Sequence, residues 1–255
     1  MMVKKTLDEI KEIKKANQII ARLFSEILPP HIKPGVSTME LNRIIEEYVR
    51  SQGAIPATIG VGGPVNPYPA GSCISVNEAV IHGVPKANII LKEGDIVSID
   101  VVTNLNGYFG DSAKTFPVGK IDEESQKLIE VAEKALEIGI AHATAGTRLG
   151  DLGNAIQTYV ESQGFNVVRD FSGHGVGKAM HEDPCVPNFG RKGRGIKLED
   201  GMVIAIEPMI NAGSYKVALL SDGWTVVTKD GRRSAHCEHS VAIVDGKPMI
   251  LSILD

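Results

Sequence analysis

The chain has 255 residues, of which 43% are hydrophobic and 23% are charged, and its net charge is −4. This composition is typical of a globular protein with a sizeable core, and the charge argues against binding to nucleic acid or to a membrane surface. No apolar run approaches the length of a membrane span. The three widely spaced cysteines, Cys73, Cys185 and Cys237, predict neither a disulfide framework nor a paired zinc motif, so we expect a reducing, cytoplasmic compartment.

The first residues, MMVKKTLDEIKEIKK, are charged throughout and lack the apolar core of a signal peptide. They have the pattern of a helix in which lysines alternate with Asp8, Glu9 and Glu12. We expect the lysines to lie on a solvated face of this helix: Lys4, Lys5, Lys11, Lys14 and Lys15.

A repeated segment follows. Residues 35–53, GVSTMELNRIIEEYVRSQG, align with residues 146–164, GTRLGDLGNAIQTYVESQG. The identical pairs are Gly35/Gly146, Leu41/Leu152, Ile45/Ile156, Tyr48/Tyr159, Val49/Val160, Ser51/Ser162, Gln52/Gln163 and Gly53/Gly164. Both copies predict a helix that ends at a glycine, and Ser37-x-x-Glu40 predicts a capping box on the first.

The duplication extends to strands, because LKEGDIVSID (91–100) aligns with LEDGMVIAIE (198–207). This alignment places Asp100 and Glu207 at equivalent positions. We therefore predict a single domain over residues 1–255, built from two pseudo-symmetric halves of about 1–120 and 121–255, with a site at their junction.

A β-hairpin is predicted at VSIDVVTNLNGYFGDS (97–112). A turn centred between Leu105 and Asn106 would put Asp100 directly opposite Asp111. A turn centred on Asn106-Gly107 would make the two aspartates diagonal neighbours on the same face. In either case, two carboxylates on a largely apolar sheet repel each other unless they share a proton or hold a cation.

Five polar side chains interrupt apolar strands and are candidates for one site: Asp100, Asp111, His174, Glu207 and Glu238. Carboxylate oxygens with one imidazole nitrogen suit Mn²⁺, Fe²⁺, Co²⁺ or Zn²⁺, and a carboxylate can bridge two ions. Two adjacent divalent ions would neutralise the acids and activate a water molecule. The sequence therefore predicts a dinuclear metal site.

These residues lie in motifs that resemble the methionine aminopeptidases, in their short bacterial type I form. The motifs are YPAGSCISVNEAVIHGVP, GDIVSIDV, NGYFGDSAKTF, GHGVGKAMHEDP, AIEPM and SAHCEHSV. The resemblance covers nearly the whole chain. It implies the α+β pita-bread fold, with duplicated halves around an antiparallel-rich sheet.

The resemblance also implies an activity: removal of the initiator methionine from new proteins when the second residue is small, through a metal-activated hydroxide. In this scheme Asp111 and Glu238 bridge the two metals, and Glu207 carries the proton from nucleophile to leaving amine. His181 stabilises the oxyanion, and His82 holds the scissile amide.

The matching positions for the methionine pocket are Tyr68, Cys73, Met180 and Trp224. Met180 and Cys237 depart from the aromatic residues common in the family, which alters the expected pocket. Asn77 and Ser234 match positions that help to hold a structural monovalent cation. We expect a monomer that acts on nascent chains, with transient ribosome contact.

Three alternatives stand beside this interpretation. An X-Pro aminopeptidase or prolidase would use the same five ligands but usually has an extra N-terminal domain. A catalytically inactive binding module would have lost ligands that are all present here. A dinuclear phosphoesterase needs phosphate-gripping cations, and Arg191, Lys192 and Arg194 lie in a glycine-rich loop that is predicted to be exposed.

Overall fold

The structure is a computed structural model that describes residues 3–255, so Met1 and Met2 of the predicted range lie outside the described residues. The α-helices are α1 (Leu7–Arg22), α2 (Thr38–Ser51), α3 (Glu123–His142) and α4 (Leu149–Ser162). A π-helical turn, η1 (Leu23–Ile27), and a 3₁₀ turn, η2 (Pro29–His31), extend α1. None of the described helices is long and apolar enough to cross a membrane.

The strands of the first half are β1 (Ile55–Pro56), β2 (Cys73–Val76), β3 (Ala79–Ile81), β4 (Ile96–Leu105) and β5 (Tyr108–Pro117). Those of the second half are β6 (Asn166–Val167), β7 (Gly173–Gly175), β8 (Glu182–Val186), β9 (Val203–Ile206), β10 (Met209–Asn211), β11 (Val217–Leu219), β12 (Val226–Thr228), β13 (Ser234–His236), β14 (His239–Val244) and β15 (Lys247–Ile250).

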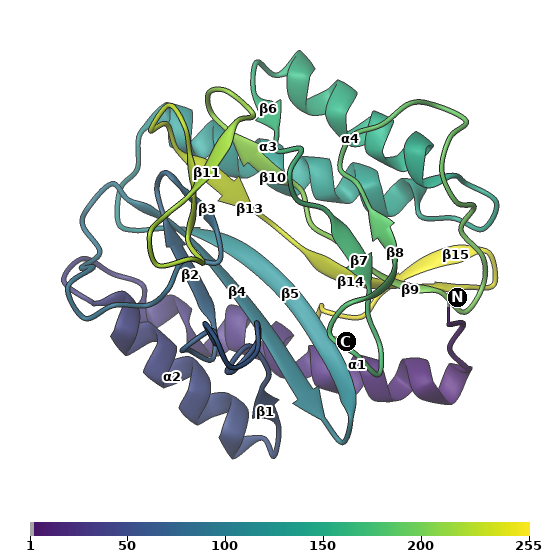
Figure 1. Ribbon diagram of the computed structural model, residues 1–255, viewed down its shortest axis with the longest axis horizontal. Coiled ribbons are helices and arrows are strands. Elements are labelled where there is room, and N and C mark those ends of the chain that lie inside the picture. Colours follow the sequence, from purple (N-terminus) through teal and green to yellow (C-terminus); the bar gives the residue numbers. More distant parts are fainter. Residues whose placement is uncertain (1–2) are drawn as a thin grey trace.

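The strands form small antiparallel sheets in the middle of the molecule, with α1 and α2 along one side and α3 and α4 along the other (Figure 1). One sheet contains β1, β2 and β5 around β4, and a second has the order β15-β14-β9-β7-β8. The shorter sheets β13-β10-β6 and β11-β12-β3 complete the layer. The predicted α+β fold with an antiparallel-rich sheet is confirmed.

The sequence repeat produces equivalent backbone contacts in the two halves. The Gly35 N–H donates to the carbonyl of Leu91 at 2.8 Å, and the Gly146 N–H donates to the carbonyl of Leu198 at 2.8 Å. Both glycines have φ of +91°, a left-handed conformation that favours glycine. Ser37 accepts from the Glu40 N–H, which is one of the two bonds of the predicted capping box, and α2 and α4 are each followed by a left-handed glycine.

Each half has its own apolar core. One core packs α2 against β2 and β4 through residues that include Leu41, Ile45 and Ile99. The other packs α3 and α4 against β9 and β14. A third cluster joins Ile10 and Ile13 of α1 to the second-half strands β9 and β14. On the basis of this cross-packing we propose that the chain forms one domain.

The hairpin of β4 and β5 turns at Asn106-Gly107, the second of the two predicted arrangements. Leu105 pairs with Tyr108, Asp100 pairs with Ala113, and Asp111 pairs with Val102. The two aspartates are therefore diagonal neighbours on one face of the sheet.

Helix α1 packs directly on β5 beside Asp111. Asn17 is fully buried, and its Oδ1 accepts the backbone N–H of Asp111 at 3.2 Å. A Cβ on Gly110 would lie 2.6 Å from the Asn17 nitrogen, so only glycine lets the helix approach this closely.

The predicted N-terminal helix is confirmed. The prediction that all its lysines are solvated is wrong for Lys5, which precedes α1 and is 8% exposed.

We expect Gly110→Ala to destabilise the protein by about 1–3 kcal/mol, because its methyl group must push α1 away from β5. Urea denaturation of the metal-free protein measures this change. Lys114→Ala, at an exposed position on the same strand, serves as control and is expected to change the unfolding free energy by less than about 0.5 kcal/mol. An unchanged midpoint in Gly110→Ala would contradict close packing of α1 against Asp111.

Candidate functional site

A single cavity between the two halves brings together every site residue that the sequence predicted. The metal candidates that line it are Asp100, Asp111, His174, Glu207 and Glu238. The substrate candidates that line it are Tyr68, Cys73, His82, Met180, His181 and Trp224. Thr58, Val61 and Val102 also line the cavity and were not predicted. The roles assigned to the individual residues stay predictions.

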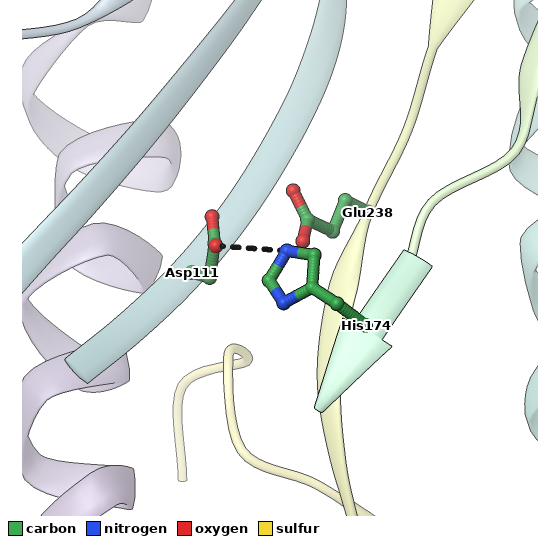
Figure 2. Close-up of side chains that lie close together, drawn as sticks. All are labelled: Asp111, His174 and Glu238. Atoms are coloured by element: carbon green, nitrogen blue, oxygen red, sulfur yellow. Dashed lines mark ion pairs between the residues drawn. The ribbon is translucent and has the colours of Figure 1, made fainter. Parts of the chain in front are cut away.

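Three of the metal candidates face one another closely. The carboxylates of Asp111 and Glu238 and the His174 imidazole offer ligand atoms that all lie within 4.8 Å of one another (Figure 2). They come from β5, from the residue before β14, and from β7. The spacing of these atoms suits a single divalent cation between them.

The backbone around these side chains is fixed by hydrogen bonds between the two halves. The Ser240 hydroxyl donates to the Asp111 carbonyl at 2.8 Å, and the Ser112 hydroxyl donates to the Glu238 carbonyl at 2.7 Å. The Glu238 N–H donates to the Ala113 carbonyl at 2.8 Å. These bonds hold the first-half and second-half acids in register before any ligand binds.

Asp100 and Glu207 line the same cavity beside this group. Glu207 Oε1 is 3.5 Å from His174 Nε2. Asp100 Oδ1 and Glu238 Oε1 are both buried without a hydrogen-bond partner. Buried carboxylate oxygens without partners are costly, and a cation would satisfy them.

The electrostatics of the site also fit a divalent cation. Burial raises the pKa of Asp111 and of Glu238 well above their ordinary values, and the nearby carboxylates of Asp100 and Glu207 raise both further. Burial raises the pKa of Asp100 to about 6, although His236 partly opposes the shift. A positive ion among these groups would favour their charged forms, so the donor set fits the predicted metal site.

Two further histidines project into the cavity. Burial lowers the pKa of His82 to about 4, and burial together with the nearby His174 lowers the pKa of His181. The ring centroids of His174 and His181 are 4.4 Å apart. Both His82 and His181 are therefore neutral at pH 7 and can still donate or accept a hydrogen bond.

His236 lies beside the site and was not among the predicted site residues. It is 2% exposed, and its Nε2 lies 3.6 Å from Glu207 Oε2 and has no hydrogen-bond partner. The signal was present in SAHCEHSV, because side chains two residues apart in extended backbone share a face, and His236 precedes Glu238 by two. His239 lies on the other face, where its Nδ1 contacts the Ser252 hydroxyl at 2.8 Å.

The apolar end of the cavity is formed by Tyr68, Cys73 and Trp224. The rings of Tyr68 and Trp224 meet edge to face at 5.2 Å, and the Tyr68 hydroxyl donates to the carbonyl of Gly83 at 2.9 Å. A Cβ on Gly62 would lie 2.5 Å from the Trp224 ring, so this glycine lets the indole pack against the 60–63 loop. Met180 lines the same cavity.

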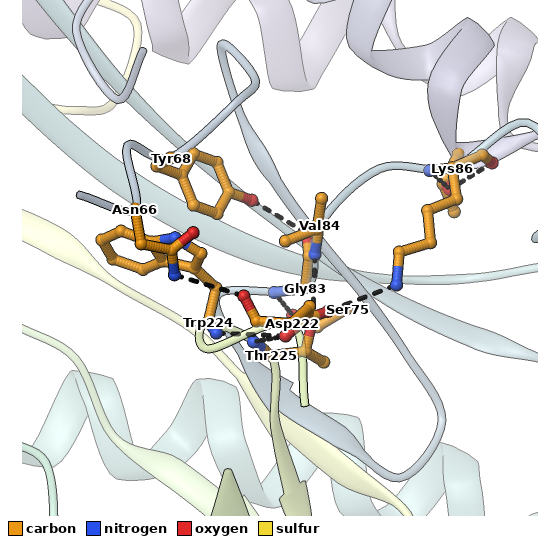
Figure 3. A network of polar contacts seen from close by, with 10 residues as sticks. Asn66, Tyr68, Ser75, Gly83, Val84, Lys86, Asp222, Trp224 and Thr225 are labelled. Atoms are coloured by element: carbon orange, nitrogen blue, oxygen red, sulfur yellow. Dashed lines mark hydrogen bonds and ion pairs between the residues drawn. The ribbon is translucent and has the colours of Figure 1, made fainter. Parts of the chain in front are cut away.

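Asp222 fixes the segment that carries Trp224 (Figure 3). Its Oδ1 accepts the backbone N–H groups of Trp224 and Thr225 at 3.0 and 2.9 Å. Its Oδ2 accepts the Thr225 hydroxyl at 2.8 Å and the Lys86 ammonium at 3.2 Å. Burial alone would raise the pKa of Asp222, but these hydrogen bonds prevail and lower it to about 2.

The residues predicted near a monovalent cation are joined by a hydrogen bond, in which the Ser234 N–H donates to the Asn77 carbonyl at 2.9 Å. Their side chains have other partners. The Asn77 amide donates to Asp95, and the Ser234 hydroxyl donates to the side chain of Asn211. A cation there would have to use backbone carbonyls, and its presence stays a prediction.

Comparison with known proteins identifies the class. Residues 11–245 match metallopeptidase family M24, and the chain belongs to this family. It is 51% identical to the methionine aminopeptidase of Clostridium perfringens over the full length of both chains. It is 49% identical to methionine aminopeptidase 1 of Bacillus subtilis, with 96% of each chain covered.

Solved structures agree with this assignment. The methionine aminopeptidase of Thermotoga maritima superposes with a TM-score of 0.96 at 42% identity, over 100% of both chains. The Xaa-Pro dipeptidase of Bacillus anthracis superposes with a TM-score of 0.78 at 22% identity, and this chain covers 63% of it. The second likeness shows a common fold only. The predicted family resemblance and the pita-bread fold are confirmed.

We expect the unfolding free energy of the metal-free protein to fall less at acidic pH in His82→Asn than in the wild type. The folded-state pKa of His82 is about 4, against an ordinary 6.5, so the unfolded chain takes up the proton first as the pH falls. The stability that depends on neutral His82 is complete above pH 6.5 and is lost between pH 6.5 and 4. Asparagine tolerates the φ of +55° at this position.

Denaturant titrations at pH 7 and pH 4.5 measure this effect. The loss of unfolding free energy over that interval should be smaller in His82→Asn than in the wild type, by on the order of 2 kcal/mol. The exposed His31→Asn is the control. An equal loss in the wild type and His82→Asn would contradict the burial of a neutral His82.

We expect Asp222→Asn to release Trp224, because the amide that replaces one carboxylate oxygen would face the ammonium of Lys86. Trp224 is the single tryptophan of the chain, so its fluorescence reports on this position alone. The emission should shift to the red as the indole gains contact with water. Asp230→Asn is the matched control, because Asp230 accepts the Ser214 and Arg232 N–H groups of another loop. Identical emission spectra for the wild type, Asp222→Asn and Asp230→Asn would refute the idea that Asp222 holds Trp224 in place.

Proposed function

We propose that this chain is a dinuclear-metal aminopeptidase that removes the N-terminal methionine of new proteins when the second residue is small. One observation carries the proposal: a buried acidic cluster, an apolar pocket and two neutral histidines line the same cavity. The names of the relatives that are 51% and 49% identical over nearly full length support this choice of substrate.

The residues that would hold the metals are four acids and one histidine: Asp100, Asp111, His174, Glu207 and Glu238. Bound divalent cations supply Lewis acidity toward the scissile carbonyl and lower the pKa of a water molecule. Co²⁺, Mn²⁺, Fe²⁺ and Zn²⁺ all suit this mixture of oxygen ligands with one nitrogen.

The chain's own groups then move protons and orient the peptide. Glu207 takes the proton of the attacking water and delivers it to the leaving amine. His181 donates a hydrogen bond to the carbonyl oxygen as negative charge develops there. His82, uncharged at neutral pH, holds the scissile amide. The methionine side chain lies among Tyr68, Cys73, Met180 and Trp224, where the thioether of Met180 adapts to the substrate sulfur.

The rival functions lack comparable support. The likeness to prolidases and the Xaa-Pro dipeptidase is at 22% identity, which carries the fold alone. An inactive binding module does not account for the retained ligand set. A dinuclear phosphoesterase would need cations that grip phosphate, but Arg191, Lys192 and Arg194 are exposed to solvent. We further propose a cytoplasmic monomer that meets nascent chains through transient ribosome contact, with a structural monovalent cation near Asn77 and Ser234.

We expect metal-free protein to release free methionine from Met-Ala-Ser only after addition of Mn²⁺, Fe²⁺ or Co²⁺. Asp111→Asn removes a charge that the two cations would share, so kcat/KM should fall at least about 100-fold at saturating metal. Chromatographic assay of free methionine measures both effects. Preferred cleavage of Ala-Pro peptides would favour the X-Pro alternative. Metal binding without cleavage of either peptide would refute the proposed activity.

A further inference from the structure

A buried ion pair joins the beginning of the chain to the turn beside the site. The Lys5 ammonium pairs with Oε2 of Glu182, and the two side chains are only 5% and 14% exposed. The next pair along the surface, Lys4 with Glu199, is 55% and 51% exposed. Removing an ion pair from water is costly unless its geometry and further hydrogen bonds compensate, so a buried pair in this place requires a reason.

Additional hydrogen bonds fix both partners. The Lys5 ammonium also donates to the carbonyl of Val3 at 2.9 Å, and the Lys5 N–H donates to the carbonyl of Gly201 at 2.7 Å. Burial would raise the pKa of Glu182, but the hydrogen bond from Lys5, together with backbone N–H groups, lowers it below the ordinary value. Glu182 is therefore charged at neutral pH, as the pair requires.

Glu182 uses its second oxygen to hold the 177–182 turn, the segment from Gly177 to Glu182. Oε1 accepts the backbone N–H of Lys178 at 2.8 Å and that of Ala179 at 3.1 Å. A Cβ on Gly177 would lie 2.5 Å from Lys5 Cε and 2.9 Å from Glu182 Oε1. The turn thus lies directly on the ion pair, with no space for a larger residue at Gly177.

This turn presents Met180 and His181 to the cavity. Met180 and His181 lie between Ala179 and Glu182 in the chain, and both line the cavity. The hydrogen bond from the Ala179 N–H to Glu182 closes the turn around them. The His181 ring lies 4.4 Å from that of His174, so a small displacement of the turn would move His181 relative to the metal candidates. Lys5 does not line this cavity, whereas Glu182 lines an adjoining hollow together with His181 and Glu207.

We propose that Lys5 and Glu182 are positioning residues that hold the 177–182 turn so that His181 and Met180 meet the substrate. Neither residue touches substrate; each acts through the turn. The proposal rests on the proposed function for its catalytic consequence, because it assumes that His181 assists hydrolysis. The placement of the turn itself is independent of that function.

The test compares Lys5→Met with Lys4→Met, which breaks the exposed neighbouring pair. Hydrogen exchange at the Lys178 and Ala179 amides should become about tenfold faster or more in Lys5→Met and stay unchanged in Lys4→Met. Unchanged exchange in Lys5→Met would overturn the proposal. If that variant does not fold, Lys5→Met combined with Glu182→Gln removes the unpaired buried charge and serves in its place.

The catalytic consequence is tested at saturating Mn²⁺ with Met-Ala-Ser. Lys5→Met should lower kcat by about 10- to 100-fold, since misplaced catalytic groups cost rates of this order. In a His181→Ala background the same substitution should lower kcat less than threefold, because its effect on kcat passes through His181, whereas Met180 acts on substrate binding. Equal losses in both backgrounds would overturn the proposal. If the wild type releases no methionine, the proposed function fails, while the exchange measurement still decides whether the pair holds the turn.

Discussion

Mutual repulsion among the buried carboxylates Asp100, Asp111 and Glu238 is the constraint on which the rest of the structure depends. Burial and neighbouring carboxylates, Glu207 among them, raise the pKa of each, so the acids resist ionisation unless positive charge lies among them. Helix α1, through Asn17, and the hydroxyls of Ser112 and Ser240 nevertheless hold the backbones of Asp111 and Glu238 in place. Packing therefore holds the acids together at a cost in folding free energy, and the result is a preorganised cation site. The cluster draws on two different sheets, because Asp111 lies on β5 and Glu238 directly precedes β14.

The same constraint separates the site into two environments. Close to the acids, hydrogen-bonding atoms such as Glu238 Oε1 and His236 Nε2 are left without partners in the protein. At the apolar end, the Tyr68 hydroxyl and the Asp222 carboxylate have hydrogen bonds supplied by the protein, although Trp224 Nε1 is buried without a partner. Unsatisfied groups favour ligand binding, whereas satisfied groups fix shape. The acidic end of the cavity is thus built to bind a cation, and the apolar end is built to keep the form of a side-chain pocket.

Much of this arrangement was predictable because its signals are local or repeated. The duplicated helices ending at Gly53 and Gly164, and the alignment of Asp100 with Glu207, predicted the two halves and their junction. The hairpin sequence restricted Asp100 and Asp111 to one face but allowed two registers, since turn position depends on how Asn106-Gly107 packs as well as on its propensity. Pairings distant in sequence could not be predicted. No periodicity indicates that Asn17 accepts from Asp111, or that Lys5 pairs with Glu182 instead of facing solvent.

The Lys5 pair illustrates why such distant contacts matter for function. His181 lies on a short turn with little apolar burial of its own, and a turn of this kind is held by hydrogen bonds rather than by packing. A surface ion pair would add little to its rigidity, because water screens the attraction. Burying the lysine against Gly177 makes loss of the contact costly, since an unpaired carboxylate would remain inside the protein. The ion pair that holds the turn is thus shielded from water, as the acidic cluster is. Burial of charge therefore creates the need for a cation among the acids, and beside His181 it fixes the turn through Lys5 and Glu182.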